Sequence, residues 1–325
     1  PILLVALPAS AQLPSALSGK SGSSLLNAIA VSARPQKLYT ADHMDLFAQI
    51  DADPADADYI IDRWGTAPML AVGDYKKGIA ECHIAPAEWW AKCRDYGDTL
   101  ALDLHNIVPC NIDVPSKKSV FPPYTTDHVD YDNGAWQCGS VNISGMDFAC
   151  YTPAPEYQGD FARVLMYMVA LYPCDYWDIA ARLIFSNNPY PVLNAYGAEQ
   201  LMAWHRADPV SECERRRNTD IAAIQGNSNP FVDAPELAEY LWGDKRGDTF
   251  AEDEESPVAL HSTYRLEEKR IYLTSPFVPQ DATWSVNGKA VNATFVETAS
   301  LGVGTHEFAF SAGAVSGKIL IKIVP

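Results

Sequence analysis

The sequence predicts an α+β protein in two parts, a mostly helical domain followed by a small all-β module. Apolar residues recur at helical spacing after Ser24 and again after Asp160, which predicts core helices. Between them, residues 79–151 are rich in Pro, Gly and Asn, which favours short strands and loops. After Gly243, short β-type runs separated by turn signals replace the helical pattern. A chain of 325 residues, 48% of them hydrophobic, can bury a substantial core.

Residues 1–18 are predicted to be a signal-peptide remnant and leader. An apolar stretch, 2–7, precedes the small residues of 9–12, as at a secretory cleavage site. The alternative is a buried N-terminal strand. No later run is apolar enough to cross a membrane, so we expect a secreted, periplasmic or cell-surface protein of a bacterium. In such a protein the seven cysteines allow up to three disulfides, whose pairing the sequence does not give.

Capping and helix-terminating residues predict where helices of the first domain, residues 19–245, begin and end. Thr40 is expected to cap a helix that places Met44, Phe47 and Ile50 on one face. Further on, a helix over 210–225 is expected to begin after an Asp208 cap, with Pro209 at its first position, and to stop at Gly226.

The last part of the chain is predicted to be an acidic linker, 246–258, and a β module, 259–325. A reduced immunoglobulin-like sandwich is the expected architecture, and such a module can bind a surface partner. Asn287-Gly288 is a hairpin-turn signal. The predicted strands are 270–274, 282–286, 290–296, 307–311 and 318–324.

The net negative charge of the chain opposes the binding of nucleic acids. Its formal net charge of -17 repels phosphate backbones, which proteins bind mainly through Lys and Arg. Part of the acidic excess lies in the run 252–255, which is typical of a solvated linker. A nucleic-acid partner therefore requires a local groove that differs from this average.

Four segments nevertheless resemble one nuclease family when they are taken together and in order. They are 81–86, 103–109, 208–218 and 225–231. In wording and order they resemble the bacterial endonuclease I family, whose members are secreted or periplasmic nucleases of the His-Me finger superfamily. The resemblance spans roughly residues 19–243. It implies a ββα-metal finger, Mg²⁺, and nonspecific hydrolysis of DNA or RNA phosphodiester bonds.

The first segment carries the catalytic base that the resemblance implies. His83 aligns with the family's general base, which activates water. Cys82 occupies the position of the family's metal-binding carboxylate, and Glu81 stands one residue earlier, where a strand points it to the opposite face. Sulfur is a poor ligand for Mg²⁺.

The second segment departs from the family as well. Asp103, His105 and Asn106 match the part that supports the finger, and Lys118 stands in place of an arginine next to the phosphate. Pro115 falls where the family has its metal-binding asparagine, and proline offers no side-chain ligand.

Three alternatives for a metal site stay open at this point. Glu81 can reach the ion if the strand is bulged. A shifted loop can bring Asn111 or Asp113 into the place of the missing asparagine. In the third alternative, Cys82, His83 and a nearby oxygen bind a softer ion such as Zn²⁺, with Mn²⁺ as a further candidate in place of Mg²⁺.

Two functions from different classes follow. One is an exported endonuclease that uses His83 as base with an altered metal site and a lowered rate. The other is a catalytically inactive nuclease fold that acts as a surface or secreted binding module. A hydrolase built on Cys82 and His83 is disfavoured, because adjacent residues of a strand point apart.

Overall fold

The computed structural model of the protein describes residues 16–40, 43–56, 58–70, 78–93, 96–250, 263–266, 269–273, 282–293, 295–312 and 315–325. The signal-peptide signature at 2–12 and the acidic run 252–255 lie outside the described residues. The chain divides into two compact units, Pro1–Ala251 and Glu252–Pro325, and each is described here by itself.

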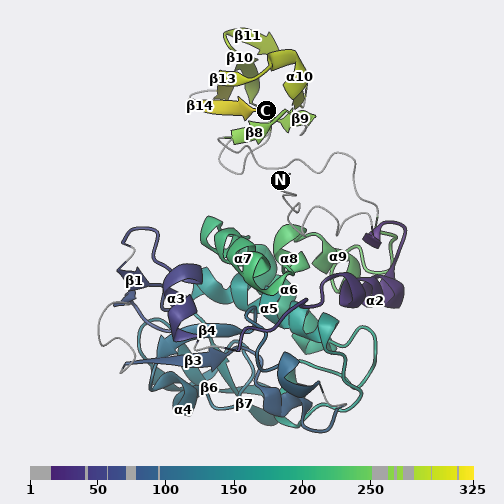
Figure 1. The fold of residues 1–325 in the computed structure, drawn as a ribbon. Helices are drawn as coiled ribbons and strands as arrows, with labels where there is room; N and C mark the ends of the chain where they lie inside the picture. The colour runs from purple at the N-terminus through teal and green to yellow at the C-terminus, as the bar shows by residue number, and fades with distance from the viewer. Residues whose placement is uncertain are drawn as a thin grey trace. The chain divides into compact units, whose positions relative to one another are not determined.

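The first unit is built around helix α5, Gln158–Leu171, which is buried along almost its whole length. An apolar surface on every side suits the centre of a large domain. Three helices pack on it, namely α2 (Gly22–Ser32), α6 (Ala195–Ala207) and α8 (Pro230–Asp233) (Figure 1). A disulfide from Cys93 to Cys174 fastens the chain after α5 to the loop region that precedes it.

The strands of this unit form small antiparallel sheets. β1 (Tyr59–Ile60) pairs with β2 (Met69–Leu70), and β3 (Ile79–His83) with β4 (Ile107–Asn111). A short helix, α4 (Val114–Lys118), follows β4. The third sheet joins β5 (His128–Asp132), β6 (Gln137–Ile143) and β7 (Met146–Thr152). The irregular middle of the sequence is therefore where the short strands lie, as predicted.

Two helix starts differ from the prediction. Helix α3, Met44–Ile50, begins after His43, so Thr40 is not its cap. Helix α7, Glu212–Gln225, begins two residues later than expected, because the Ser211 hydroxyl accepts the Glu214 N–H at 3.1 Å. The Asp208 carboxylate instead accepts the Gly159 N–H at 2.8 Å.

The end of α7 is confirmed. Gly226 has φ 81°, the left-handed conformation that favours glycine at a helix end. The last short helix of this unit, α9 (Leu237–Leu241), packs against α2 and α8. No helix among the described residues has the length and apolar character that a membrane crossing requires.

The second unit is a β module with its own apolar core. Its elements are β8 (Thr263–Arg265), β9 (Arg270–Tyr272), β10 (Thr283–Val286), β11 (Lys289–Val291), β12 (Phe295–Glu297), α10 (Thr298–Leu301), β13 (Gly304–Ala312) and β14 (Val315–Val324). One sheet has the order β11-β10-β13-β14-β8, and a second pairs β12 with β9. Asn287 and Gly288 have φ 49° and 77°, which makes the predicted hairpin between β10 and β11. The predicted strand 290–296 is divided between the two sheets.

Candidate active site

His83 is the last residue of β3 and lies opposite Ile107 of β4. Successive side chains of a strand point to opposite faces, so His83 and Glu81 share one face while Cys82 occupies the other. The face of His83 includes Ile79 and Ile107, which pack with Phe47 of α3. The imidazole is half-buried at the edge of this small apolar cluster.

The hydrogen bond of the His83 ring determines its tautomer. Nε2 lies 2.8 Å from the carbonyl oxygen of Ala101. A carbonyl oxygen only accepts, so Nε2 carries the proton and Nδ1 keeps a lone pair. A neutral imidazole held in this way presents Nδ1 as a proton acceptor. The geometry therefore suits a general base.

Glu81 does not stand in for Cys82. The pairing of β3 with β4 is one to one from Ile79 to His83, without a bulge, so Glu81 stays on the His83 face. Its carboxylate lies 3.1 Å from Nδ1 of His43, the residue that precedes α3. The structure therefore excludes the alternative in which a bulge in β3 brings Glu81 to the metal.

Cys82 faces the main core together with Cys110 and Lys118. Cys82 is 3% exposed, and a hydrogen bond with the Cys110 thiol lowers the pKa of Cys82. Lys118 is 1% exposed, and its Nζ lies 5.3 Å from the centre of the Tyr151 ring. Burial lowers the pKa of Lys118, whereas the nearby thiols of Cys82 and Cys110 raise it. We call these three residues the Cys82 cluster.

Helix α4 explains how Lys118 reaches this cluster. Lys118 follows Pro115 by three residues, so both lie on the same side of α4, which packs against β3. The Lys118 amine donates to the carbonyl oxygen of Ser119, the residue that follows α4, at 3.5 Å. Lys118 thus points into the core rather than toward a solvent-exposed phosphate.

The Cys82 cluster does not fit a hard divalent cation. Its donors are two thiols and an amine, and Pro115 contributes no ligand atom. An ammonium group at this place also repels a metal ion. Among the described residues, no group of three or more His, Cys, Asp and Glu side chains is arranged for a metal.

The other candidate ligands lie apart from His83. Asn111 pairs with Ile79 at the opposite end of β3, roughly 13 Å along the strand from His83. Asp113 is exposed beyond it, and its N–H donates to the Asn111 side chain at 3.0 Å. Cys82 and His83 point to opposite faces, so the two do not converge on Zn²⁺ or Mn²⁺.

Asp103 is a buried hydrogen-bond acceptor that joins distant parts of the chain. It is 0% exposed. One oxygen accepts the hydroxyls of Tyr167 and Tyr172 at 2.8 and 2.7 Å. The other accepts Gln225 Nε2 at 2.9 Å and the N–H of His105 at 3.1 Å. Asp103 thus ties the turn before β4 to helices α5 and α7.

Asn106 and His105 complete this turn. Asn106 makes two hydrogen bonds to the backbone of Ala85, at 2.8 and 2.9 Å, and so fixes the chain that follows His83. The His105 ring lies against Tyr167 and contacts the carbonyl oxygen of Asn227 at 3.2 Å. Its burial lowers the pKa of His105 to about 4, so the ring is neutral at pH 7. Both residues make structural contacts here, and their supporting role in a metal finger stays a prediction.

Buried arginines hold the same turn from the other side. Arg217 of α7 donates to the carbonyl oxygens of Leu104 and Ile107 and to Asp51. Arg63 shares Asp51 at 2.7 Å. The Arg217 side chain therefore fixes the start of β4 relative to α7. Because His83 pairs with Ile107 at the start of β4, the same contacts help to position His83.

Comparisons with known proteins establish the family of the chain. The sequence model of the family described as Endonuclease I matches residues 23–236. The chain belongs to the endonuclease I family. It is similar to an extracellular ribonuclease of Bacillus amyloliquefaciens, with 29% identity over 238 residues, covering 69% of this chain and 76% of the relative. A second extracellular ribonuclease, from Bacillus subtilis (strain 168), is 32% identical over 161 residues, covering 47% of this chain and 52% of the relative.

Because the chain belongs to the endonuclease I family, it is classed as a nuclease, and its substrate class is nucleic acid. The family is generally metal-dependent. Three contacts of this endonuclease I site were not predicted from the sequence: His43 with Glu81, Ala101 with His83, and Tyr151 with Lys118. The first and third depend on packing between distant segments, and a backbone carbonyl has no sequence signature.

Proposed function

We propose that the chain is a secreted nuclease that hydrolyses phosphodiester bonds of RNA, and also of DNA, nonspecifically. The observation that carries the proposal is the His83 ring, whose Nε2 proton is held by the Ala101 carbonyl oxygen while Nδ1 remains an acceptor. The names of the two Bacillus relatives support RNA as a substrate and export as the destination. The antiparallel pair β3–β4 followed by α4 supports a ββα finger as the scaffold of this proposal.

The proposed step is general-base catalysis. Nδ1 of His83 takes a proton from water as the water oxygen attacks phosphorus, and the bond from phosphorus to the leaving oxygen breaks. The leaving oxygen then takes up a proton. Asn106 keeps the chain after His83 in place, and the Ala101 carbonyl keeps the imidazole oriented.

Within the family, a divalent metal ion stabilises charge on the phosphate. In this chain Cys82 and Pro115 stand at the positions that the resemblance assigns to the ligands of Mg²⁺, and neither offers the oxygen donor that this ion prefers. A base that acts without a Lewis acid at the expected place has a lowered rate. We therefore expect a slow nuclease.

A second function is favoured by the Cys82 cluster. In the Cys82 cluster, buried thiols and an amine occupy the place where the resemblance predicts a metal ligand. A nuclease fold that has been retained for binding alone is expected to lack its metal ligands in this way. In that case the β module, proposed as an immunoglobulin-like sandwich, provides attachment to a surface partner.

One experiment separates these functions. Purified protein is incubated with single-stranded RNA and supercoiled plasmid, with Mg²⁺, Mn²⁺ or Zn²⁺ and with EDTA. His83→Ala is expected to lower the cleavage rate about 10²- to 10⁴-fold, the usual contribution of a positioned base. The matched control is His128→Ala, which removes an exposed histidine of β5 and leaves the rate unchanged.

Two outcomes would contradict the proposal that the chain is a nuclease with His83 as its base. Equal cleavage by wild type and His83→Ala means that His83 is not the base. Absence of cleavage under every condition leaves the binding function, which is then tested by binding of labelled RNA without turnover.

A further inference from the structure

Cys82 and Cys110 are two free thiols on the neighbouring strands β3 and β4. Cys82 lies opposite Val108 in the register of these strands, and Cys110 lies two residues beyond Val108. Opposite residues of an antiparallel pair share a face of the sheet, and so do residues two apart on one strand. Cys82 and Cys110 are therefore diagonal neighbours on the face that packs into the main core.

The two thiols point toward each other inside the protein. Cys82 is 3% exposed and Cys110 is 0% exposed, and a hydrogen bond joins their sulfur atoms. The Cys110 thiol also donates to the carbonyl oxygen of Ala80 at 3.4 Å. Diagonal neighbours on two strands have Cα atoms about 7–8 Å apart, and a disulfide joins Cα atoms up to about 7 Å apart. A small approach of the two strands therefore brings the sulfur atoms to bonding distance.

A disulfide elsewhere in the chain indicates the conditions that these thiols meet. Cys93 is bonded to Cys174. Such bonds persist in oxidising compartments, whereas the cytosol keeps thiols reduced. The bond between Cys93 and Cys174 and the export included in the proposed function both indicate an oxidising environment for Cys82 and Cys110. The inference rests on that export and does not depend on the reaction of His83.

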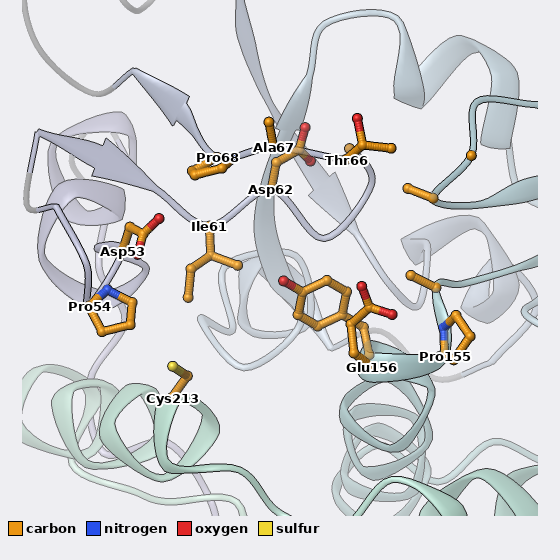
Figure 2. A pocket seen from close by; sticks show the side chains of 15 residues that line it. Asp53, Pro54, Ile61, Asp62, Thr66, Ala67, Pro68, Pro155, Glu156 and Cys213 are labelled. Carbon is orange, nitrogen blue, oxygen red and sulfur yellow. The ribbon is translucent and has the colours of Figure 1, made fainter.

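The other three free cysteines have different surroundings. The Cys138 thiol donates to the carbonyl oxygen of Lys117 at 3.5 Å. Cys138 pairs with Tyr151, and Cys150 directly precedes Tyr151, so Cys138 and Cys150 point to opposite faces of their sheet. Cys213 of α7 lines a cavity that has no other cysteine among its described lining residues (Figure 2). The contacting thiols of β3 and β4 are therefore the pair for which the structure favours a bond.

We propose that Cys82 and Cys110 are a redox-active pair that forms a disulfide across β3 and β4. Each thiol gives up its proton, the two sulfur atoms become bonded, and two electrons pass to an external disulfide such as glutathione disulfide. The external disulfide takes up both protons and becomes two thiols. Because the pair is buried, the exchange takes place before the strands pack or when they open locally. The bond links the strand that ends at His83 to its partner without a metal ion.

The test is disulfide mapping of the full chain after incubation of the purified protein with glutathione disulfide. The protein is unfolded in guanidinium, its free thiols are labelled with N-ethylmaleimide without reduction, and the digested peptides are identified by mass spectrometry. We expect the peptides of Cys82 and Cys110 to be linked, and label to be absent from both cysteines, in most molecules. The linked peptides of Cys93 and Cys174 are the positive control.

Two variants test whether the pairing is specific. In Cys110→Ser, Cys82 is expected to carry the label, because its partner is absent. The matched control is Cys138→Ser, which removes another buried thiol and is expected to leave the link between Cys82 and Cys110 unchanged. Thermal unfolding verifies the fold of each variant. If Cys110→Ser does not fold, the wild type and Cys138→Ser still decide the result.

Three results would overturn the proposal. They are label on Cys82 or Cys110 in most wild-type molecules, a glutathione adduct at either cysteine, and a link from either cysteine to a third one. The mapping uses no RNA, so its failure leaves the proposed nuclease activity untouched. Conversely, a protein that forms the link and cleaves no RNA would contradict only the proposed function.

Discussion

The turn at Asp103 and the Cys82 cluster differ in what their buried polar side chains contact. In the turn, the side chains of Asp103, His105 and Asn106 make hydrogen bonds at buried positions. In the Cys82 cluster, Cys82 and Lys118 lie buried at the two positions where the resemblance predicts a metal-binding carboxylate and an arginine. The hydrogen bonds of the turn are therefore formed without a donor set for Mg²⁺ in the neighbouring cluster.

The largest expected effect on stability comes from the turn. Asp103→Ala leaves two tyrosine hydroxyls and the Gln225 amide without their acceptor in the core. The free energy of unfolding is expected to fall by about 4 kcal/mol. Urea denaturation measures it, with exposed Asp98→Ala as control, expected to change by less than about 0.5 kcal/mol. Equal losses in both variants would remove the special role of the turn.

The pH dependence of stability tests the burial of His105. Its folded pKa of about 4 lies below the ordinary value of 6.5, so the unfolded chain binds the proton first as the pH falls. Stability is therefore full above pH 6.5, and roughly 3 kcal/mol is lost between pH 6.5 and 4. His105→Gln, which cannot titrate, is expected to flatten the curve by that amount. His205 has a similarly lowered pKa and is unchanged in both proteins, so its effect cancels. Parallel curves would contradict the assignment.

Asn106 gives a smaller effect. Asn106→Ala removes two hydrogen bonds to Ala85 and leaves both backbone groups of that residue unsatisfied at a buried position. The expected loss is about 2 kcal/mol in urea denaturation. Because the bonds fix the chain after His83, the rate of RNA cleavage is expected to fall as well. A change in stability without a change in rate would limit Asn106 to folding.

The Cys82 cluster is expected to behave in the opposite way. Lys118→Met replaces a buried amine by an apolar side chain of similar length, and the free energy of unfolding is expected to rise by about 1 kcal/mol. The control is Lys117→Met, at the preceding residue, whose side chain is half-buried against Tyr131. Its free energy of unfolding is expected to change by close to zero. A loss above about 2 kcal/mol in Lys118→Met would show that the cluster requires the amine.

Local signals predicted the parts of the fold that depend on few residues. Gly226 marked the end of α7, and Asn287-Gly288 marked a hairpin, because left-handed backbone conformations restrict the residue type. The start of α7 was placed wrongly, since Asp208 and Ser211 are both good caps and tertiary contacts with Gly159 decide between them. At the site, the face of His83 followed from strand alternation. The burial of Lys118 did not, because it depends on packing against β7.

The central proposal is that this chain keeps the nuclease scaffold while Cys82 and Pro115 leave no ligand for Mg²⁺ at the position that the resemblance predicts. The most direct measurement is RNA cleavage over a Mg²⁺ titration by wild type and by the triple variant Cys82→Glu, Pro115→Asn, Lys118→Arg, with circular dichroism as the control for folding. We predict that Mg²⁺ leaves the wild-type rate nearly unchanged and raises the rate of the triple variant at least about tenfold. A wild-type rate that rises with Mg²⁺ as steeply as that of the triple variant would contradict the account.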